Sequence, residues 1–126
     1  MKQITRKVTL VDLRDLLDHP PRANVAWIDA DGIRAAPVRF RLIDGRYWIC
    51  GRGDGPGASP AAGQRVVVLL IDDGYLYFDL RGARIAGRTE RSGTAPAEFH
   101  GDANWLELIV ERTTAWHYGF LRRRQG

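Results

Sequence analysis

The sequence predicts a mainly β domain with one short N-terminal helix, and three observations support this prediction. Asp31-Gly32 and Asp44-Gly45 each lie between stretches of alternating apolar residues, and Asp-Gly favours the two-residue turn of a β-hairpin. The segment Val66–Ile71 is apolar on both faces, as is typical of a central strand. A change of apolar phase beside Gly82 predicts a bulge or bend of the kind that a strand needs to wrap around a barrel.

Length and composition indicate one domain that covers residues 1–126. The hydrophobic content of 44% and charged content of 27% are ordinary for a globular protein, and residues 1–8 and 122–126 are expected to be flexible tails. The net charge of +4 favours anionic partners but does not choose among nucleic acid, nucleotide and acidic lipid.

Several classes of protein are excluded or disfavoured by simple features. Cys50 is the one cysteine, so an internal disulfide and a multi-thiolate metal site are excluded. The N-terminus lacks the apolar core of a signal peptide, and the longest apolar run is too short to span a bilayer. We therefore expect a cytoplasmic protein without a membrane partner.

The first predicted element is a short amphipathic helix. Thr9 followed by Asp12 resembles a capping box, and four leucines fall on one helical face: Leu10, Leu13, Leu16 and Leu17. Pro20 and Pro21 should end the helix, because proline lacks an amide hydrogen. We expect the helix to plug one end of the sheet.

Two hairpins follow the helix. A loop at Asp31-Gly32 would place Trp27 opposite Ala36 and Val25 opposite Val38. A loop at Asp44-Gly45 would pair Ile43 with Arg46, and alternation then gives the second hairpin two different faces. Its core face carries Val38, Phe40, Leu42, Tyr47 and Ile49; its other face carries Arg39, Arg41, Arg46 and Arg52 around Trp48 and Cys50. The second face is cationic and aromatic, a chemistry suited to a planar, phosphorylated ligand.

The second half of the chain reads as a loop followed by three strand segments. Gly51–Gly63 is too rich in glycine and proline to be regular and should be a mobile loop. After the central strand at Val66–Ile71, the inward positions change from even to odd numbers: first Leu76, Phe78 and Leu80, then Ala83, Ile85 and Gly87. The last strand, Trp105–Glu111, should point Leu106, Leu108 and Val110 inward.

A final segment places Trp116, Tyr118 and Phe120 on one side. Three aromatic residues on one side of so short a segment exceed what a small barrel readily buries, and a partner subunit is a natural place for them.

The order and spacing of these elements resemble one known family. The motifs A-x-P-V-x-F, L-R-G-x-x-x-x-G and W-L-E-L-x-V-E-R-x-x-x-W-x-Y, spread from about Leu10 to Tyr118, are similar to those of the pyridoxamine 5′-phosphate oxidase-like, FMN-binding split-barrel family. The resemblance implies a mainly β, six-stranded split β-barrel with a short N-terminal helix. It also implies a homodimer with two flavin or deazaflavin sites in the subunit interface.

The resemblance further implies where the cofactor would lie. The strand at residues 37–41 would run beside the isoalloxazine ring, the end of the strand at 48–52 with the following loop would contact the phosphate, and Trp116 would reach the site, often from the other subunit. The candidate cofactor-binding residues are Arg39, Phe40, Cys50, Gly51, Arg52, Gln64, Arg65 and Trp116. Many family members have a serine or threonine and then a lysine in the loop that follows the third strand. This chain has no lysine there, so Arg52 or Arg65 would have to serve the phosphate, or the site has decayed or been retuned for another ligand.

Three functional hypotheses follow. The first is an FMN- or deazaflavin-dependent oxidoreductase that acts on a small organic substrate in the dimer cleft; the second is a deazaflavin-binding or cofactor-lacking member without turnover. The third and least favoured is a small basic barrel that binds nucleic acid. A flavin carries the redox chemistry itself, so the sequence identifies no catalytic residue. His19, His100 and His117 lack metal-ligand spacing, and no metal is expected.

Overall fold

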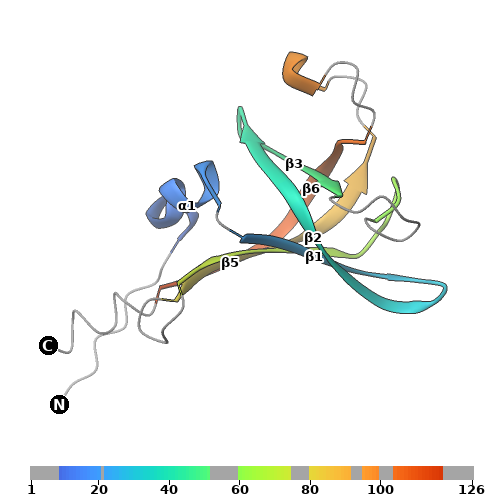
Figure 1. The fold of residues 1–126 in the computed structure, drawn as a ribbon, viewed down its shortest axis with the longest axis horizontal. Coiled ribbons are helices and arrows are strands. Elements are labelled where there is room, and N and C mark those ends of the chain that lie inside the picture. The colour runs from blue at the N-terminus through green and yellow to red at the C-terminus, as the bar shows by residue number, and fades with distance from the viewer. Residues whose placement is uncertain are drawn as a thin grey trace, which may run out of the picture.

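The computed structural model describes residues 9–20, 22–51, 60–74, 80–91, 95–99 and 104–117. Within these ranges six antiparallel strands close into a barrel in the order β1-β2-β3-β6-β5-β4 (Figure 1). The strands are β1 Arg22–Asp29, β2 Gly32–Ile43, β3 Arg46–Gly51, β4 Val67–Asp73, β5 Arg81–Glu90 and β6 Leu106–His117. The helical elements are η1 Leu10–Leu13, α1 Arg14–Asp18 and η3 Ala97–Phe99. The prediction of a mainly β, six-stranded barrel with a short N-terminal helix is confirmed.

The N-terminal helical turns begin and end where the sequence predicts. The backbone N–H of Thr9 donates to the Asp12 carboxylate at 2.9 Å, which is one half of a capping box. α1 ends at Asp18, two residues before Pro20. Leu13, Leu16 and Leu17 are buried in the same apolar cluster as the strands, so the helical segment covers one end of the barrel as predicted.

Apolar side chains from all six strands fill the barrel. The most deeply buried include Val25 and Trp27 on β1, Leu69 and Ile71 on β4, and Ile85 on β5. Burial alternates along β4 and along most of β5, because successive side chains of a strand point to opposite faces.

The predicted register of the first hairpin is wrong by two residues. Asp29 pairs with Gly32, so the loop is Ala30-Asp31, and Trp27 lies opposite Arg34 instead of Ala36. The Asp29 carboxylate accepts a hydrogen bond from the Asp31 N–H at 2.8 Å, which stabilises this earlier turn, while Gly32 supplies a positive φ of 110°. The core side is nevertheless correct, because a shift of two residues preserves which side chains share a face.

The second hairpin forms as predicted. Ile43 pairs with Arg46, and Asp44 and Gly45 have φ values of 51° and 76°, the positive values that a type I′ turn requires. Phe40 pairs with Ile49 on the core face, and Arg39 pairs with Cys50 on the other face.

The strand β2 is shared between two ladders, and this opens the barrel on one side. Its first half, up to Pro37, pairs with β1, whereas Val38–Ile43 pair with β3. Within the described ranges, no strand pairs with the other edge of Val38–Ile43. In Figure 1 the β2–β3 hairpin accordingly rises away from the level of β1, with α1 beside it. This opening is the split of the barrel.

The bulge predicted beside Gly82 is absent from the described residues of β5, and a bulge is found instead on β6. The ladders of β5 with β4 and with β6 continue without interruption through Gly82, and the register instead shifts between Ala86 and Gly87, where Glu111 of β6 is the extra residue. A Cβ atom on Gly87 would lie 1.9 Å from the carbonyl oxygen of Ile109, so β6 approaches β5 at a distance that only glycine allows. Gly82 has a packing role, because a Cβ there would meet the Trp116 ring at 2.5 Å.

The two C-terminal segments form one strand, β6. Leu106 and Leu108 are buried as predicted, but Val110 is 36% exposed, which corrects that assignment. Val110 lies immediately before the bulge residue, where the strand changes which side chains face inward.

Other predictions fall on residues outside the described ranges. These are the flexible tails, most of the Gly51–Gly63 loop, the inward positions Leu76 and Phe78, and the aromatic residues Tyr118 and Phe120. A search of the described residues for a helix long and apolar enough to cross a bilayer found none.

Candidate functional site

A hollow of about 360 Å³ opens at the split of the barrel. It is bordered by Val38–Arg41 of β2, by Asp18, Pro20 and Ala23 where the helical segment leads into β1, and by Trp105 just before β6. We call it the split hollow. It exists because β1 and β2 stop pairing at Asn24 and Pro37, which leaves the edge of β2 open.

The guanidinium of Arg39 lies at the split hollow in an ordered arrangement. It donates to the Cys50 sulfur at 2.9 Å and lies over the Trp105 ring at 5.3 Å from the centroid. The Phe99 ring stacks on Trp105, with 4.2 Å between the ring centroids and an interplanar angle of 9°. Phe99 in turn meets the edge of the fully buried Trp48 ring at 5.5 Å. Arg39, Trp105 and Phe99 thus form a series of cation–π and aromatic contacts beside the hollow.

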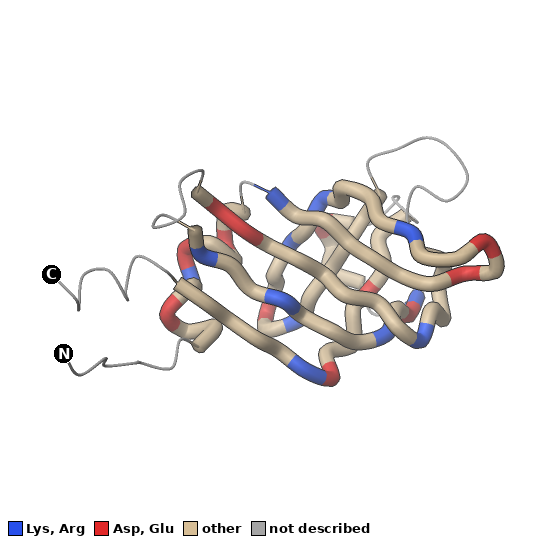
Figure 2. The backbone as a smooth tube through the Cα atoms, turned by 90° about the horizontal axis from the view of Figure 1, so that it is seen from below, with Lys and Arg blue, Asp and Glu red and all other residues tan. Residues whose placement is uncertain are grey.

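Two other arginines of the same face are paired with carboxylates. Arg46 makes a bidentate contact with Glu107, at 3.0 and 2.7 Å, and Arg41 meets Glu98 at 2.9 Å. The Glu107 hydrogen bond raises the pKa of Arg46. These pairs reduce the positive charge of the face, so it is not a continuous basic surface. Figure 2 likewise shows basic residues spread along the strands.

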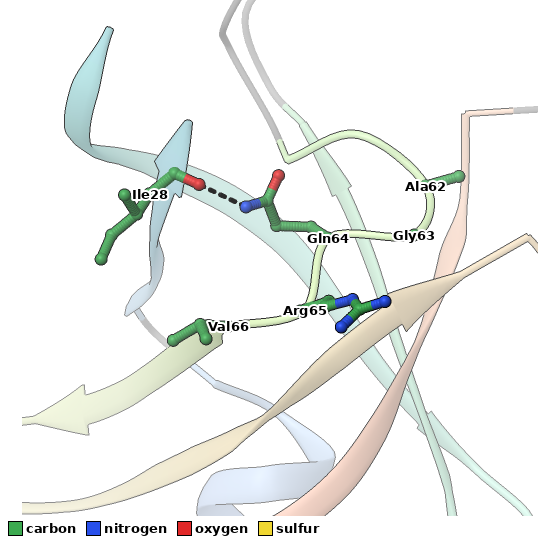
Figure 3. A pocket seen from close by; sticks show the side chains of 6 residues that line it. All are labelled: Ile28, Ala62, Gly63, Gln64, Arg65 and Val66. Carbon is green, nitrogen blue, oxygen red and sulfur yellow. Dashed lines mark hydrogen bonds between the residues drawn. The ribbon is translucent and has the colours of Figure 1, made fainter. Parts of the chain in front are cut away.

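A second hollow, of about 460 Å³, lies at the other end of β1 and contains the two remaining loop candidates. It is lined by Ile28 and by Ala62–Val66, and we call it the loop hollow. Figure 3 shows the Gln64 amide directed to the Ile28 carbonyl oxygen, to which it donates a hydrogen bond, while the Arg65 side chain extends away from Gln64. Gln64 therefore fastens the loop to β1, and Arg65 is exposed with no ion-pair partner among the described residues.

The buried Thr89 holds this loop in place. Its hydroxyl donates to the Ala61 carbonyl oxygen at 2.7 Å and accepts from the Gln64 N–H at 3.1 Å. Its backbone N–H donates to Gln64 and its carbonyl oxygen accepts from Gly63. The backbone that precedes Arg65 is thus fastened to β5 by hydrogen bonds.

The structure does not bring all predicted site residues together in one chain. Arg39 lies at the split hollow, and Gln64 and Arg65 lie at the loop hollow. Trp116 pairs with Gly82 at the beginning of β5, whereas Gln64 is bonded to Thr89 near its end, so these two are at opposite ends of that strand.

The other candidates are placed by the second hairpin. Phe40 is buried in the core beside Tyr47, so its backbone faces the split hollow rather than its ring. Cys50 is buried beneath Arg39, Gly51 ends β3 opposite Val38, and Arg52 lies outside the described ranges.

The sequence does not predict that Trp105 lines the split hollow or that Phe99 stacks on Trp105. Trp105 was interpreted as the start of a strand, and Phe99 lay in a connection without a pattern. A signal for Trp105 did exist: once Ile49 pairs with Leu106, the register brings Trp105 beside Cys50, and Cys50 beside Arg39.

Charged groups near the helical segment form a separate network. Arg81 contacts Asp15 at 2.8 Å and Asp73 at 3.1 Å. The hydrogen bond from Arg81 lowers the pKa of Asp15; burial opposes the charge of Arg81, but the two carboxylates raise its pKa overall. Burial raises the pKa of Tyr47. Among the described residues, no group of three or more metal-ligating side chains is found.

The fold and the split hollow define a class of protein: a split β-barrel with an open strand edge beside a guanidinium. The same fold occurs in an FAD-binding protein from Mycobacterium smegmatis (TM-score 0.65, 16% identity over 86% of this chain and 94% of that one). It also occurs in a conserved hypothetical protein from Mycobacterium tuberculosis (TM-score 0.63, 18% identity, covering 94% of this chain and 91% of that one). A third example, from Corynebacterium glutamicum, carries the provisional name pyridoxamine 5′-phosphate oxidase (TM-score 0.61, 12% identity, covering 87% of this chain and 90% of that one).

These similarities confirm the split-barrel fold that the sequence resemblance predicted. Comparison of the sequence with protein-family profiles and with curated proteins gives no match.

Proposed function

We propose that the protein is a flavin-binding oxidoreductase that works as a single-domain, cytoplasmic homodimer on a small organic substrate. The observation that carries the proposal is the split hollow, where the open edge of Val38–Arg41 lies beside the Arg39 guanidinium. A strand edge offers alternating N–H and C=O groups, and the edge of a flavin ring carries complementary acceptors and donors. The residues present therefore fit such a ring.

The names of the neighbouring folds support a flavin as the ligand. Two of them, from Mycobacterium smegmatis and Mesorhizobium loti, are named FAD-binding proteins. FMN is the cofactor that we favour from the sequence resemblance, with FAD and a deazaflavin as the alternatives to be compared directly.

The chain's own residues would bind and orient the cofactor, which supplies hydride or electron transfer when bound. Arg39 would contact a negatively charged group at the split hollow. Arg65, whose preceding residue is bonded to Thr89, would supply a second cation where the loop has no lysine. Trp116 of a second copy could complete the site, because within one chain it lies at the far end of β5 from Gln64.

A binding protein without turnover is the second candidate. It is favoured by the absence of lysine from Gly51–Gly63 and by the use of the Gln64 amide to fasten the loop. Measurement of turnover with a reduced nicotinamide donor and an electron acceptor separates it from the oxidoreductase.

Spectroscopy and titration test the proposal. We expect the purified protein to carry visible flavin absorbance that is released on denaturation, or to bind FMN, FAD or a deazaflavin when titrated. Arg65→Gln should lower the affinity for phosphorylated flavins about tenfold, since a charge-assisted hydrogen bond contributes roughly 1.5–3 kcal/mol. Arg84→Gln is the matched control, because Arg84 is an exposed arginine of β5 that lines neither hollow. A colourless protein that binds none of the three ligands would refute the proposal.

A further inference from the structure

Arg41 belongs both to the split hollow and to an ion pair. Its side chain lines the hollow next to Phe40, and its guanidinium meets the Glu98 carboxylate at 2.9 Å. Glu98 comes from η3 and does not itself line the hollow, so it reaches the guanidinium from outside. A cation that an anionic ligand would meet in the hollow is therefore already held by a carboxylate of the same chain.

The Arg41–Glu98 pair can open at low cost. The two side chains are 50% and 52% exposed, respectively, so water competes for both charges. An exposed ion pair of this kind contributes little to stability, because its Coulomb energy is screened and two long side chains lose freedom when they form it. An anionic group of a ligand can thus take the place of the carboxylate without disturbing the barrel.

The backbone that carries Glu98 is held in place by the next residue. Phe99 is 5% exposed, stacks on the Trp105 ring and meets the edge of the Trp48 ring at 5.5 Å. Its backbone N–H donates to the Pro96 carbonyl oxygen at 2.9 Å. Only the Glu98 side chain has to move when the pair opens. A carboxylate tethered so close to the guanidinium acts at a high effective concentration, so a free ligand must compete with it.

We infer that Glu98 is an internal competitor that sets the charge selectivity of the split hollow: a negatively charged ligand group binds Arg41 only when it displaces the Glu98 carboxylate. This inference rests on the proposed function, and it adds a residue that determines specificity. The competition lowers the affinity for an anionic ligand, whereas an uncharged ligand leaves the pair intact and is unaffected.

The other arginine–glutamate pair on this face does not have the same geometry. Arg46 and Glu107 form two hydrogen bonds, Glu107 is only 15% exposed, and neither residue lines the split hollow. That pair joins β3 to β6, whereas the pair of Arg41 and Glu98 lies where a ligand can reach it.

Two chemical groups of a flavin could supply the negative charge. One is the phosphate, which FMN has and riboflavin lacks; the other is the ring, which becomes anionic when the flavin is reduced. Titration of both ligands in both redox states distinguishes these sources. A phosphate that meets Arg41 favours FMN in either state, whereas a reduced ring that meets Arg41 favours the reduced form of either ligand.

The experiment measures dissociation constants of FMN and riboflavin, oxidised and dithionite-reduced, for the full-length wild type and its variants. Charge selectivity is the ratio of the dissociation constant of the less charged ligand to that of the more charged one. Glu98→Gln should raise this ratio about threefold, and Arg41→Gln should lower it about threefold, as expected for an exposed pair. In the Arg41→Gln background, Glu98→Gln should add little, because the two residues act through one contact.

Glu111→Gln is the matched control for net charge. Glu111 is an exposed glutamate of β6 that lines neither hollow, and the substitution removes the same charge as Glu98→Gln. It should leave the charge selectivity within about 1.5-fold of the wild type, because exposed charges at a distance are screened.

The inference is overturned if Glu98→Gln raises the charge selectivity no more than Glu111→Gln does, since net charge alone then explains the change. It is also overturned if Glu98→Gln has its full effect in the Arg41→Gln background. Either result leaves flavin binding by the wild type, and with it the proposed function, in place. Wild-type protein that binds no flavin would overturn both, so the two failures are distinguishable. Thermal unfolding of each variant confirms that the comparison is made on folded protein.

Discussion

At the scale of single residues, β6 approaches β5 closely at Gly87. The β6 bulge brings the Ile109 carbonyl oxygen to the position where any other residue would carry its Cβ. The backbone on both sides of the bulge is paired in the β5–β6 ladder, so it cannot move away without breaking hydrogen bonds. The glycine at the end of the L-R-G-x-x-x-x-G motif is therefore explained by packing alone.

We predict that Gly87→Ala destabilises the protein by about 3 kcal/mol or more, because overpacking against backbone cannot be relieved by a rotamer change. Gly45→Ala is the matched control. A Cβ at Gly45 meets nothing within 4 Å, and the cost is that of a positive φ, about 1–2 kcal/mol. Urea unfolding measures both values, and equal losses in the two variants would contradict this account of the bulge.

Arg39 and Trp105 show which site residues can be predicted from the sequence and which cannot. Arg39 is a site candidate because β alternation places it on the polar face of the second hairpin and the family resemblance places that strand beside the cofactor. Trp105 was missed because its position depends on the pairing of β3 with β6, which are more than fifty residues apart and have no local signal. The helix and most strands could be predicted from local patterns, and the split barrel from the family resemblance. The site depends on pairings of distant strands that local patterns do not determine.

At the scale of elements, local turn chemistry determined which predictions succeeded. The second hairpin formed as predicted since its Asp-Gly pair occupies the two loop positions. The first did not, because the Asp29 side chain competes for the turn one residue earlier. A bulge could be expected because a strand must bend to wrap around a barrel. Its position depends on the pairing of β5 with β6.

The attachment of the helical segment to the barrel gives a pH-dependent prediction. The Asp15–Arg81 contact lowers the pKa of Asp15 below its usual value near 3.8, so its stabilising effect is complete above that value and is lost as the pH falls through the lowered pKa. We expect Asp15→Asn to reduce the free energy of unfolding at pH 7 by at most about 1 kcal/mol, as is typical of an exposed pair.

Urea unfolding between pH 7 and pH 2.5 measures this effect. The difference between the wild type and Asp15→Asn should be constant above about pH 5 and should shrink below about pH 4. Asp31→Asn, an exposed loop substitution, is the control. A difference that persists unchanged at pH 2.5 would show that the charge of Asp15 is not responsible.

At the scale of the whole molecule, one face of the barrel exposes large apolar side chains. Ile33 and Ile28 pair across β2 and β1, and the β1–β4 register continues to Val66, so the three form a row across neighbouring strands. They are 82%, 54% and 59% exposed, respectively. An apolar row of this kind is a natural contact for the second copy in the proposed homodimer.

We predict that the wild type has twice the 14.2 kDa mass of one chain in solution, and that Ile33→Asp shifts it toward the monomer. A buried unpaired carboxylate on each side of a twofold interface should weaken association by at least about tenfold. Light scattering with size-exclusion chromatography measures the mass. Val11→Asp, at an 84% exposed position of η1, is the control, and a dimer that is indifferent to Ile33→Asp would place the interface elsewhere.

β2 changes from pairing with β1 to pairing with β3 at Pro37, the last residue that pairs with β1. Residues of a strand direct their N–H and C=O groups alternately to the two neighbouring strands, and Pro37 has the same direction as Arg39 and Ile43, which is toward β3. Its missing amide hydrogen therefore removes a donor on the β3 side and does not limit pairing with β1. The limit is the length of β1, which begins at Arg22, only two residues before Asn24. Access to the edge of Val38–Ile43 thus depends on where the first strand begins.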